Sequence, residues 1–253
     1  MTMLTIDLNC DMGEALGIYP MPNDDILMDF ISSANIACGF HAGGPEIMEY
    51  TVQSALAKGV AIGAHPGLPD LEGFGRREMK ISPSEAYRMT LYQISTLNSF
   101  VQAAGGRLHH VKPHGALYNM AARDSALAKA IADAVHNFDP LLILYGLAGS
   151  EMITAAEDLG LRTASEVFAD RTYRDDGSLT PRTESNALIN DGNESIRHVM
   201  QIVNHQQVIS VNNKIVPLKA ETICLHSDGE HAVEFAKLIH GKLLSEGINI
   251  KAP

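Results

Sequence analysis

Acidic and amide side chains occupy every second position near the start of the chain. The segment TIDLNCDMGE, residues 5–14, places Asp7, Asn9 and Asp11 on one side of an extended strand, because successive strand side chains point to opposite faces. The apolar residues Ile6 and Leu8 fall on the other side. A buried carboxylate is costly unless it is neutralised, hydrogen-bonded or bound to a metal ion. The alternation therefore predicts a strand with one face in the core and the other in a polar site.

The same alternation recurs at the ends of later apolar segments. In SANIACGFH and GVAIGAHPG, a terminal histidine shares the parity of small or amide residues. In a closed barrel of parallel strands, this polar parity enters the lumen, and active sites form at the carboxyl ends of the strands. We therefore expect one mouth of a barrel to gather chemically active side chains from separate strands: Asp11, His41, His65, Lys112, His114, Glu166, Asp170 and His226.

Three of these side chains have the chemistry of metal ligands. Asp11, His41 and His65 would offer one carboxylate and two imidazoles, which suits zinc or a similar divalent cation. They lack the close local spacing of an HExxH site. A metal-free network of charged hydrogen bonds, with Lys112 as a cation, is the alternative.

Short apolar segments alternate with longer amphipathic ones along the chain, which indicates βα units and a parallel sheet. The expected strands lie near 4–9, 34–38, 60–64, 108–112, 141–145, 162–168 and 221–225. The expected helices are 23–32, 45–58, 83–104, 124–137, 148–159, 193–204 and 229–246. We predict an α/β fold: a single (β/α) barrel over 1–253, with a distorted or seven-stranded form as the alternative to a regular one. A β-hairpin excursion is expected near 207–218, where two β-branched runs flank Asn212 and Asn213.

The composition narrows the class of partner. The formal net charge of -11 over 253 residues argues against nucleic acid and anionic membranes, since both require basic surface. The chain has no apolar run long enough to span a bilayer and no signal-peptide pattern at its start. The three cysteines lack CxxC spacing and are expected to be reduced thiols. We expect a cytoplasmic protein that acts on a small molecule or with another protein.

Two arginine-bearing loops follow predicted strands. GLPDLEGFGRRE, 67–78, offers Arg76 and Arg77 to a carboxylate or phosphate, and DRTYRDDGSLTPR, 170–182, offers Arg171 and Arg182. Each loop has an alternative interpretation as a solvated surface turn. The chain lacks a GxxxxGK[ST] phosphate loop, so a nucleotide would be held in another way or by another chain.

Five blocks of sequence together resemble the LamB/YcsF family: DLNCDMGE, NIACGFHAGGP, GAHPGLPDLEGFGRR, VKPHGALYN and FADRTYRDDGSLTPR. The resemblance runs from about residue 4 to residue 245. The chain departs from the family pattern at Gly44, at Gly67 and Leu68, and over residues 227–229. The resemblance implies a β/α barrel similar to those of glycoside hydrolases and polysaccharide deacetylases.

The resemblance also implies an activity, namely ATP-dependent opening of the lactam of 5-oxo-L-proline to L-glutamate, performed together with the B and C subunits of a 5-oxoprolinase. In this interpretation Asp11 or Glu14 positions or deprotonates water, and Lys112 and His114 stabilise developing negative charge. The candidate substrate-binding residues are Asn9, His41, Arg77 and Asp170.

Two other functions remain open from the sequence. A stand-alone metal-dependent amidase or deacetylase would use Asp11, His41 and His65 to hold a cation and would need neither ATP nor partners. A non-catalytic binding protein would use the same polar mouth to carry a ligand, and would tolerate neutralisation of its acidic residues.

Overall fold

A closed barrel of parallel strands forms the centre of the molecule. The computed structural model describes residues 4–15, 22–225 and 232–253. Among these residues, seven strands form the barrel in the order β1, β2, β3, β4, β5, β6 and β9, and β1 pairs with both β2 and β9. The strands are β1 (Thr5–Met12), β2 (Ser33–Ala37), β3 (Ala61–His65), β4 (Leu108–Val111), β5 (Ile143–Leu147), β6 (Arg162–Phe168) and β9 (Thr222–Leu225). The expectation of a seven-stranded barrel is confirmed.

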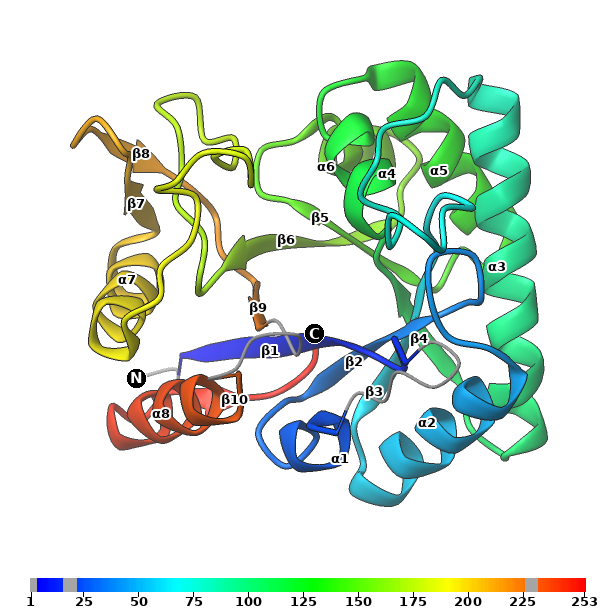
Figure 1. Cartoon of the computed structure of the whole chain (residues 1–253), viewed down its shortest axis with the longest axis horizontal. Helices are drawn as coiled ribbons and strands as arrows, with labels where there is room; N and C mark the ends of the chain where they lie inside the picture. The colour runs from blue at the N-terminus through cyan, green and yellow to red at the C-terminus, as the bar shows by residue number, and fades with distance from the viewer. Residues whose placement is uncertain (1–3, 16–21, 226–231) are drawn as a thin grey trace.

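The first strand changes partner along its length. Its first two residues pair with β10 (Asn249–Ile250), and from Asp7 onward it pairs with β9. The chain therefore returns to its own start, and the C-terminus lies near β1 in the centre of the ribbon (Figure 1).

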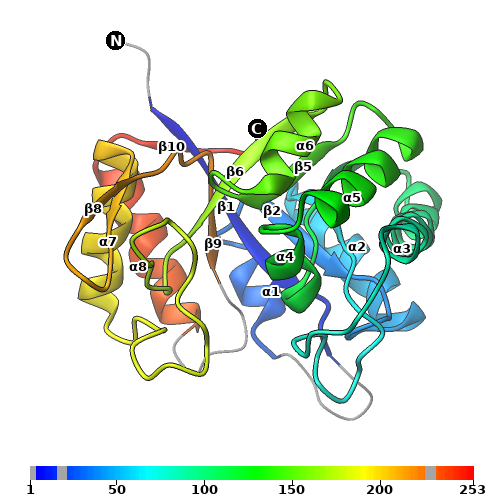
Figure 2. The ribbon, with the colours of Figure 1, turned by 90° about the horizontal axis from the view of Figure 1, so that it is seen from above.

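Helices surround the barrel (Figures 1 and 2). They are α1 (Asp24–Leu27), α2 (Pro45–Lys58), α3 (Pro83–Ala103), α4 (Gly115–Ala121), α5 (Ser125–Phe138), α6 (Glu151–Asp158), α7 (Gly192–His205) and α8 (Ala232–Ser245). The main apolar core includes Leu8, Cys10 and Met12 of β1, whereas a small separate cluster contains Ile143, Tyr145 and Ala164. The apolar parity of β1 therefore lies in the main core, as the alternation predicts.

Hydrogen bonds between neighbouring residues fix the start of α3. Ser82 accepts a hydrogen bond from the Glu85 amide while the Glu85 carboxylate accepts one from the Ser82 amide, so the capping box predicted at the start of α3 is present.

Two helix predictions differ from the structure. The helix expected over 23–32 is only four residues long, and α4 occupies a segment where the sequence pattern predicts no helix. Both helices are too short for a 3.6-residue period to identify.

A β-hairpin stands outside the barrel. Strands β7 (Gln207–Ile209) and β8 (Ile215–Pro217) pair antiparallel, and Asn213 adopts a positive φ of 60° in the turn between them. Figure 1 shows this hairpin beyond the end of α7. Within the described ranges, no helix is both long and apolar enough to cross a membrane.

Candidate functional site

The deepest layer of the lumen is built around Asp7. Its carboxylate accepts hydrogen bonds from the hydroxyls of Ser33, Tyr145 and Thr222, at 2.8, 3.0 and 2.5 Å, and also from that of Ser32. Burial raises the pKa of Asp7 despite these bonds. Because the carboxylate is 1% exposed and surrounded by hydroxyl donors, Asp7 connects strands rather than facing a substrate.

The next layer holds a buried lysine between two carboxylates. Lys112 Nζ lies 2.9 Å from Asp11 Oδ1 and 2.8 Å from Glu166 Oε1. Asn9 accepts a further hydrogen bond from Lys112 at 3.1 Å and donates to Glu166 at 3.0 Å. Burial alone would lower the pKa of Lys112, but Asp11 and Glu166 raise it well above its usual value. Lys112 therefore remains charged and neutralises its neighbours.

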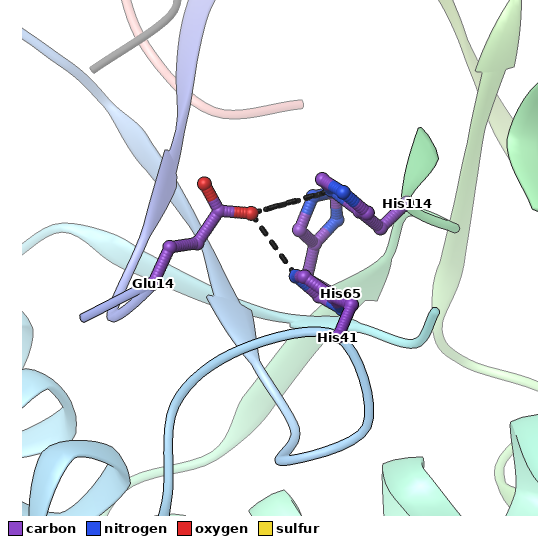
Figure 3. Close-up of side chains that lie close together, drawn as sticks. All are labelled: Glu14, His41, His65 and His114. Atoms are coloured by element: carbon purple, nitrogen blue, oxygen red, sulfur yellow. Dashed lines mark hydrogen bonds and ion pairs between the residues drawn. The ribbon is translucent and has the colours of Figure 1, made fainter. Parts of the chain in front are cut away.

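A third layer, at the carboxyl ends of the strands, joins Glu14 to three histidines (Figure 3). All four side chains are buried, and one ligand atom from each lies within 4.8 Å of the others. Glu14 Oε1 is 3.0 Å from His41 Nε2 and 3.3 Å from His114 Nδ1. His65 Nε2 is 2.9 Å from His114 Nδ1 and 3.3 Å from Asp11 Oδ2. We call Glu14, His41, His65 and His114 the histidine cluster.

Backbone carbonyls set the tautomers of two of these rings. The carbonyl oxygen of Lys112 lies 2.6 Å from His65 Nδ1, and that of Phe74 lies 2.9 Å from His114 Nε2. A carbonyl can only accept, so each of these nitrogens carries the hydrogen. In the neutral rings, His65 Nε2 and His114 Nδ1 then direct lone pairs at each other and at Glu14. A cation between them, either a proton or a metal ion, would satisfy these lone pairs.

The histidines of this cluster suit a metal ion. Burial lowers the pKa of both His41 and His114 well below its usual value, and neighbouring imidazoles lower it further. Neutral imidazoles with a carboxylate are a donor set that suits zinc and similar divalent ions. The histidine cluster therefore fits such an ion. It shares His41 and His65 with the ligands expected from the sequence, adds Glu14 and His114, and leaves Asp11 beside the cluster.

Glycines allow the backbone to pack directly against these rings. A Cβ atom on Gly67 would lie 2.5 Å from His41 Nδ1, and one on Gly75 would lie 2.7 Å from His41 Cβ and 3.0 Å from His114 Cδ2. Gly67 therefore lies where any larger residue would collide with His41. Within the described part of the chain, His41 Nδ1 has no hydrogen-bond partner.

A cavity of about 850 Å³ opens above these layers. Asp11, His65, Lys112 and His114 line its inner part. The segments after β3, β4, β5 and β6 form the rest of its wall, which includes the side chains of Arg76, Arg123, Arg171, Arg174, Arg182, Ser150, Ser178, Thr180 and Thr183. Carboxylate, imidazole and guanidinium groups thus share one cavity.

The predicted site residues are distributed unevenly. Asn9, Asp11, Glu14, His41, His65, Lys112 and His114 converge within the three layers described above. Arg77 instead makes hydrogen bonds with Asp70 and is 62% exposed, and the described cavity wall contains Arg76. Asp170 is half-buried, and its backbone carbonyl accepts from the Ile189 amide. His226 and residues 227–229 lie outside the described residues.

Arg123 and Arg174 line the cavity but are not among the candidates from the sequence. Arg123 follows α4, a helix that the sequence pattern does not predict, so no expected element placed it near the site. Arg174 lies in the DRTYRDDG block, where its position between two candidate arginines was the available signal.

Comparison with known proteins places this geometry in context. The sequence profile of the LamB/YcsF family matches residues 6–253. Over 250 residues, the chain is 57% identical to a protein of Tolumonas auensis that is named as the A subunit of 5-oxoprolinase, with 99% of this chain and 100% of the relative covered.

Solved structures agree with the fold. The lactam utilization protein from Thermus thermophilus superposes with a TM-score of 0.93 at 43% identity, covering 99% of this chain and 100% of that one. The catalytic domain of a peptidoglycan N-acetylglucosamine deacetylase from Eubacterium rectale superposes with a TM-score of 0.53 at 11% identity, covering 98% and 88%. The second likeness concerns the fold alone, and it agrees with the deacetylase-type barrel expected from the sequence.

Proposed function

The chain belongs to the LamB/YcsF family, and on that premise we propose that it is the A subunit of an ATP-dependent 5-oxoprolinase that opens the lactam of 5-oxo-L-proline to L-glutamate. The main support for the proposal is the 57% identity, over nearly the whole chain, to a protein named as the A subunit of 5-oxoprolinase. The cavity adds to this support, because carboxylate and imidazole groups at its inner end suit hydrolysis of an amide.

The chemistry explains a requirement for ATP and for partners. A lactam is a resonance-stabilised amide and a poor electrophile. Transfer of the γ-phosphoryl group of ATP to the lactam oxygen releases ADP and activates the ring carbon. Because the chain lacks a phosphate loop, we assign this transfer mainly to the B and C subunits, acting in the cytoplasm.

The remaining steps belong to this chain. Water adds to the activated carbon as its proton passes to a base, and the C–N bond breaks as the ring nitrogen takes a proton. A second water then releases inorganic phosphate from the resulting acyl phosphate. We assign the base to Asp11, which lines the cavity and is held in place through Oδ1 by Asn35 and Lys112, at 2.8 and 2.9 Å.

The test is reconstitution from purified subunits. L-glutamate formation from 5-oxo-L-proline and ATP is measured with this chain and the B and C subunits together, and with each of the three omitted in turn. We expect activity only in the complete mixture. Unchanged activity without this chain would contradict the proposal, as would full activity of this chain alone.

A second candidate function is a metal-dependent amidase, which the histidine cluster specifically favours. A divalent ion held by Glu14, His41, His65 and His114 would act as a Lewis acid. Such an enzyme would hydrolyse its substrate without ATP and without the B and C subunits. Activity of the isolated chain that is lost on chelation and restored by metal would therefore select this function over the first.

The metal site itself can be tested without any activity assay. We expect the purified chain to bind about one zinc ion, and the variants His65→Ala and His114→Ala to lose it. His205→Ala, at the exposed end of α7, is the matched control and should retain the metal. Equal metal content in all four proteins would place the ion elsewhere.

A further inference from the structure

The wall of the cavity is far more basic than the rest of the molecule. The chain carries a formal net charge of -11, yet five arginines line this one cavity. The carboxylates that line it within the described residues are Asp11, Glu78 and Asp176. Asp11 is paired with Lys112, Glu78 with Arg123, and Asp176 accepts from Ser178. The cavity wall thus concentrates positive charge on an acidic protein.

One internally hydrogen-bonded segment presents three of these arginines. Between β6 and α7, Arg171 donates to the carbonyls of Thr180 and Ala187, at 2.6 and 3.3 Å. Tyr173 is fully buried, and its hydroxyl accepts from the Phe168 amide at 2.8 Å. The backbone of Arg174 donates to Ser178 at 2.8 Å. These contacts hold residues 170–188 in a defined fold beside the cavity, with the side chains of Arg174 and Arg182 exposed.

The positive charges of Arg171 and Arg182, both in this wall, repel each other. Burial, with the nearby charge of Arg182, lowers the pKa of Arg171 to about 10. An anion bound between cations relieves such repulsion, and arginine forks match the geometry of phosphate oxygens.

The size of the cavity points to a ligand larger than the lactam. A volume of about 850 Å³ lies in the upper part of the range for pockets that enclose drug-sized ligands, about 300–1,000 Å³. 5-oxo-L-proline is one five-membered ring with a carboxylate. A phosphoryl group on its lactam oxygen would extend it from the inner carboxylate and imidazoles toward the arginines.

We propose that Arg76, Arg174 and Arg182 form a phosphate subsite that receives the O-phosphorylated lactam and orients its ring carbon toward Asp11. This inference rests on the proposed function for the identity of the ligand. The recognised chemistry is a phosphoryl group, which ATP also carries. The missing phosphate loop favours the activated lactam.

The test is calorimetric titration of the isolated chain with inorganic phosphate and, separately, with ATP. We expect phosphate to bind, and the double variant Arg174→Gln/Arg182→Gln to weaken binding at least tenfold. Both side chains are exposed, and Arg174 pairs only at the surface with Glu184, so folding should be preserved. Arg107→Gln is the control, because Arg107 is an exposed arginine that pairs with Asp139 outside this cavity. Absence of phosphate binding, or equal weakening by the control, would overturn the subsite.

The ATP titration distinguishes the two candidate ligands of the subsite, the phosphorylated lactam and ATP. The activated-lactam assignment predicts that ATP binds no more tightly than inorganic phosphate. Much tighter, arginine-dependent ATP binding would overturn that assignment in favour of a nucleotide. In the reconstituted complex, the double variant should form less glutamate for each ADP released. Failure of the wild-type complex to form glutamate would contradict the proposed function, whereas phosphate titration tests the subsite by itself.

Discussion

At the scale of single residues, the polar lumen is organised by opposite charges. Lys112 is a sequence-based candidate for stabilising negative charge in the reaction, but its ammonium group already contacts Asp11, Glu166 and Asn9, at 2.9, 2.8 and 3.1 Å. With Cys224 Sγ also at 3.1 Å, the acceptors around this ammonium outnumber its three hydrogens. Its principal role is therefore to neutralise two buried carboxylates and position Asp11.

The variant Lys112→Met tests this role. Loss of the cation leaves buried carboxylates uncompensated, so we expect the free energy of unfolding to fall by about 3–5 kcal/mol. Urea denaturation measures the change. Lys129→Met, in an exposed pair with Asp133 on α5, should cost less than about 1 kcal/mol. A Lys112→Met protein as stable as this control would show that the charge pairing is unimportant.

At the scale of elements, the segment after β3 holds the histidine cluster together. The carbonyl of Phe74 accepts from His114, and the adjacent Gly75 packs against both His41 and His114. Phe74 and Gly75 both have positive φ, of 54° and 64°. This backbone conformation brings the segment close to the rings, where a side chain would not fit.

Gly75→Ala should therefore disturb the histidine cluster as well as strain the backbone. A positive φ costs a non-glycine residue about 1–2 kcal/mol, and the new Cβ would additionally collide with His41. Gly59→Ala is the matched control, since Gly59 has a similar φ of 69° but no atom near its Cβ position. We expect Gly75→Ala to lower the unfolding free energy more than Gly59→Ala does and to lose metal. Equal effects on stability and metal content would contradict this explanation.

Elements also show where sequence-based prediction succeeds and where it fails. The alternation in β1 identifies the inward face of Asp7, Asn9 and Asp11, because strand periodicity is set by covalent geometry. The choice between Arg76 and Arg77 cannot be made in this way. Both lie in a non-periodic loop, where Arg77 turns to Asp70 and Arg76 reaches the cavity. Tertiary contacts decide such orientations.

At the scale of the whole molecule, two neutral histidines, the buried His110 and the half-buried His198, link stability to pH. Burial lowers the pKa of His198 to about 4, and burial with the nearby His109 and Lys112 lowers that of His110 well below its usual value. An unfolded histidine titrates near pH 6.5. The folded state therefore binds fewer protons than the unfolded state between about pH 6.5 and 4. This contribution to stability is complete above that window and is lost as the pH falls through it.

We expect unfolding midpoints in urea to be lower at pH 5 than at pH 7.5, and this difference to shrink in His198→Gln. His205→Gln, an exposed histidine on the same helix, should leave the difference unchanged. Identical pH dependence in the wild type and in His198→Gln would show that His198 contributes nothing to this linkage.

The proposed opening of the lactam by this barrel depends above all on Asp11. The most direct measurement is the rate of L-glutamate formation by Asp11→Asn in the reconstituted complex, with chain folding checked by circular dichroism. Loss of a positioned base should reduce turnover by roughly a hundredfold or more, while Lys112 keeps its pairing with Glu166 and the barrel remains folded. Full turnover by a folded Asp11→Asn chain would contradict the assignment of the base to Asp11.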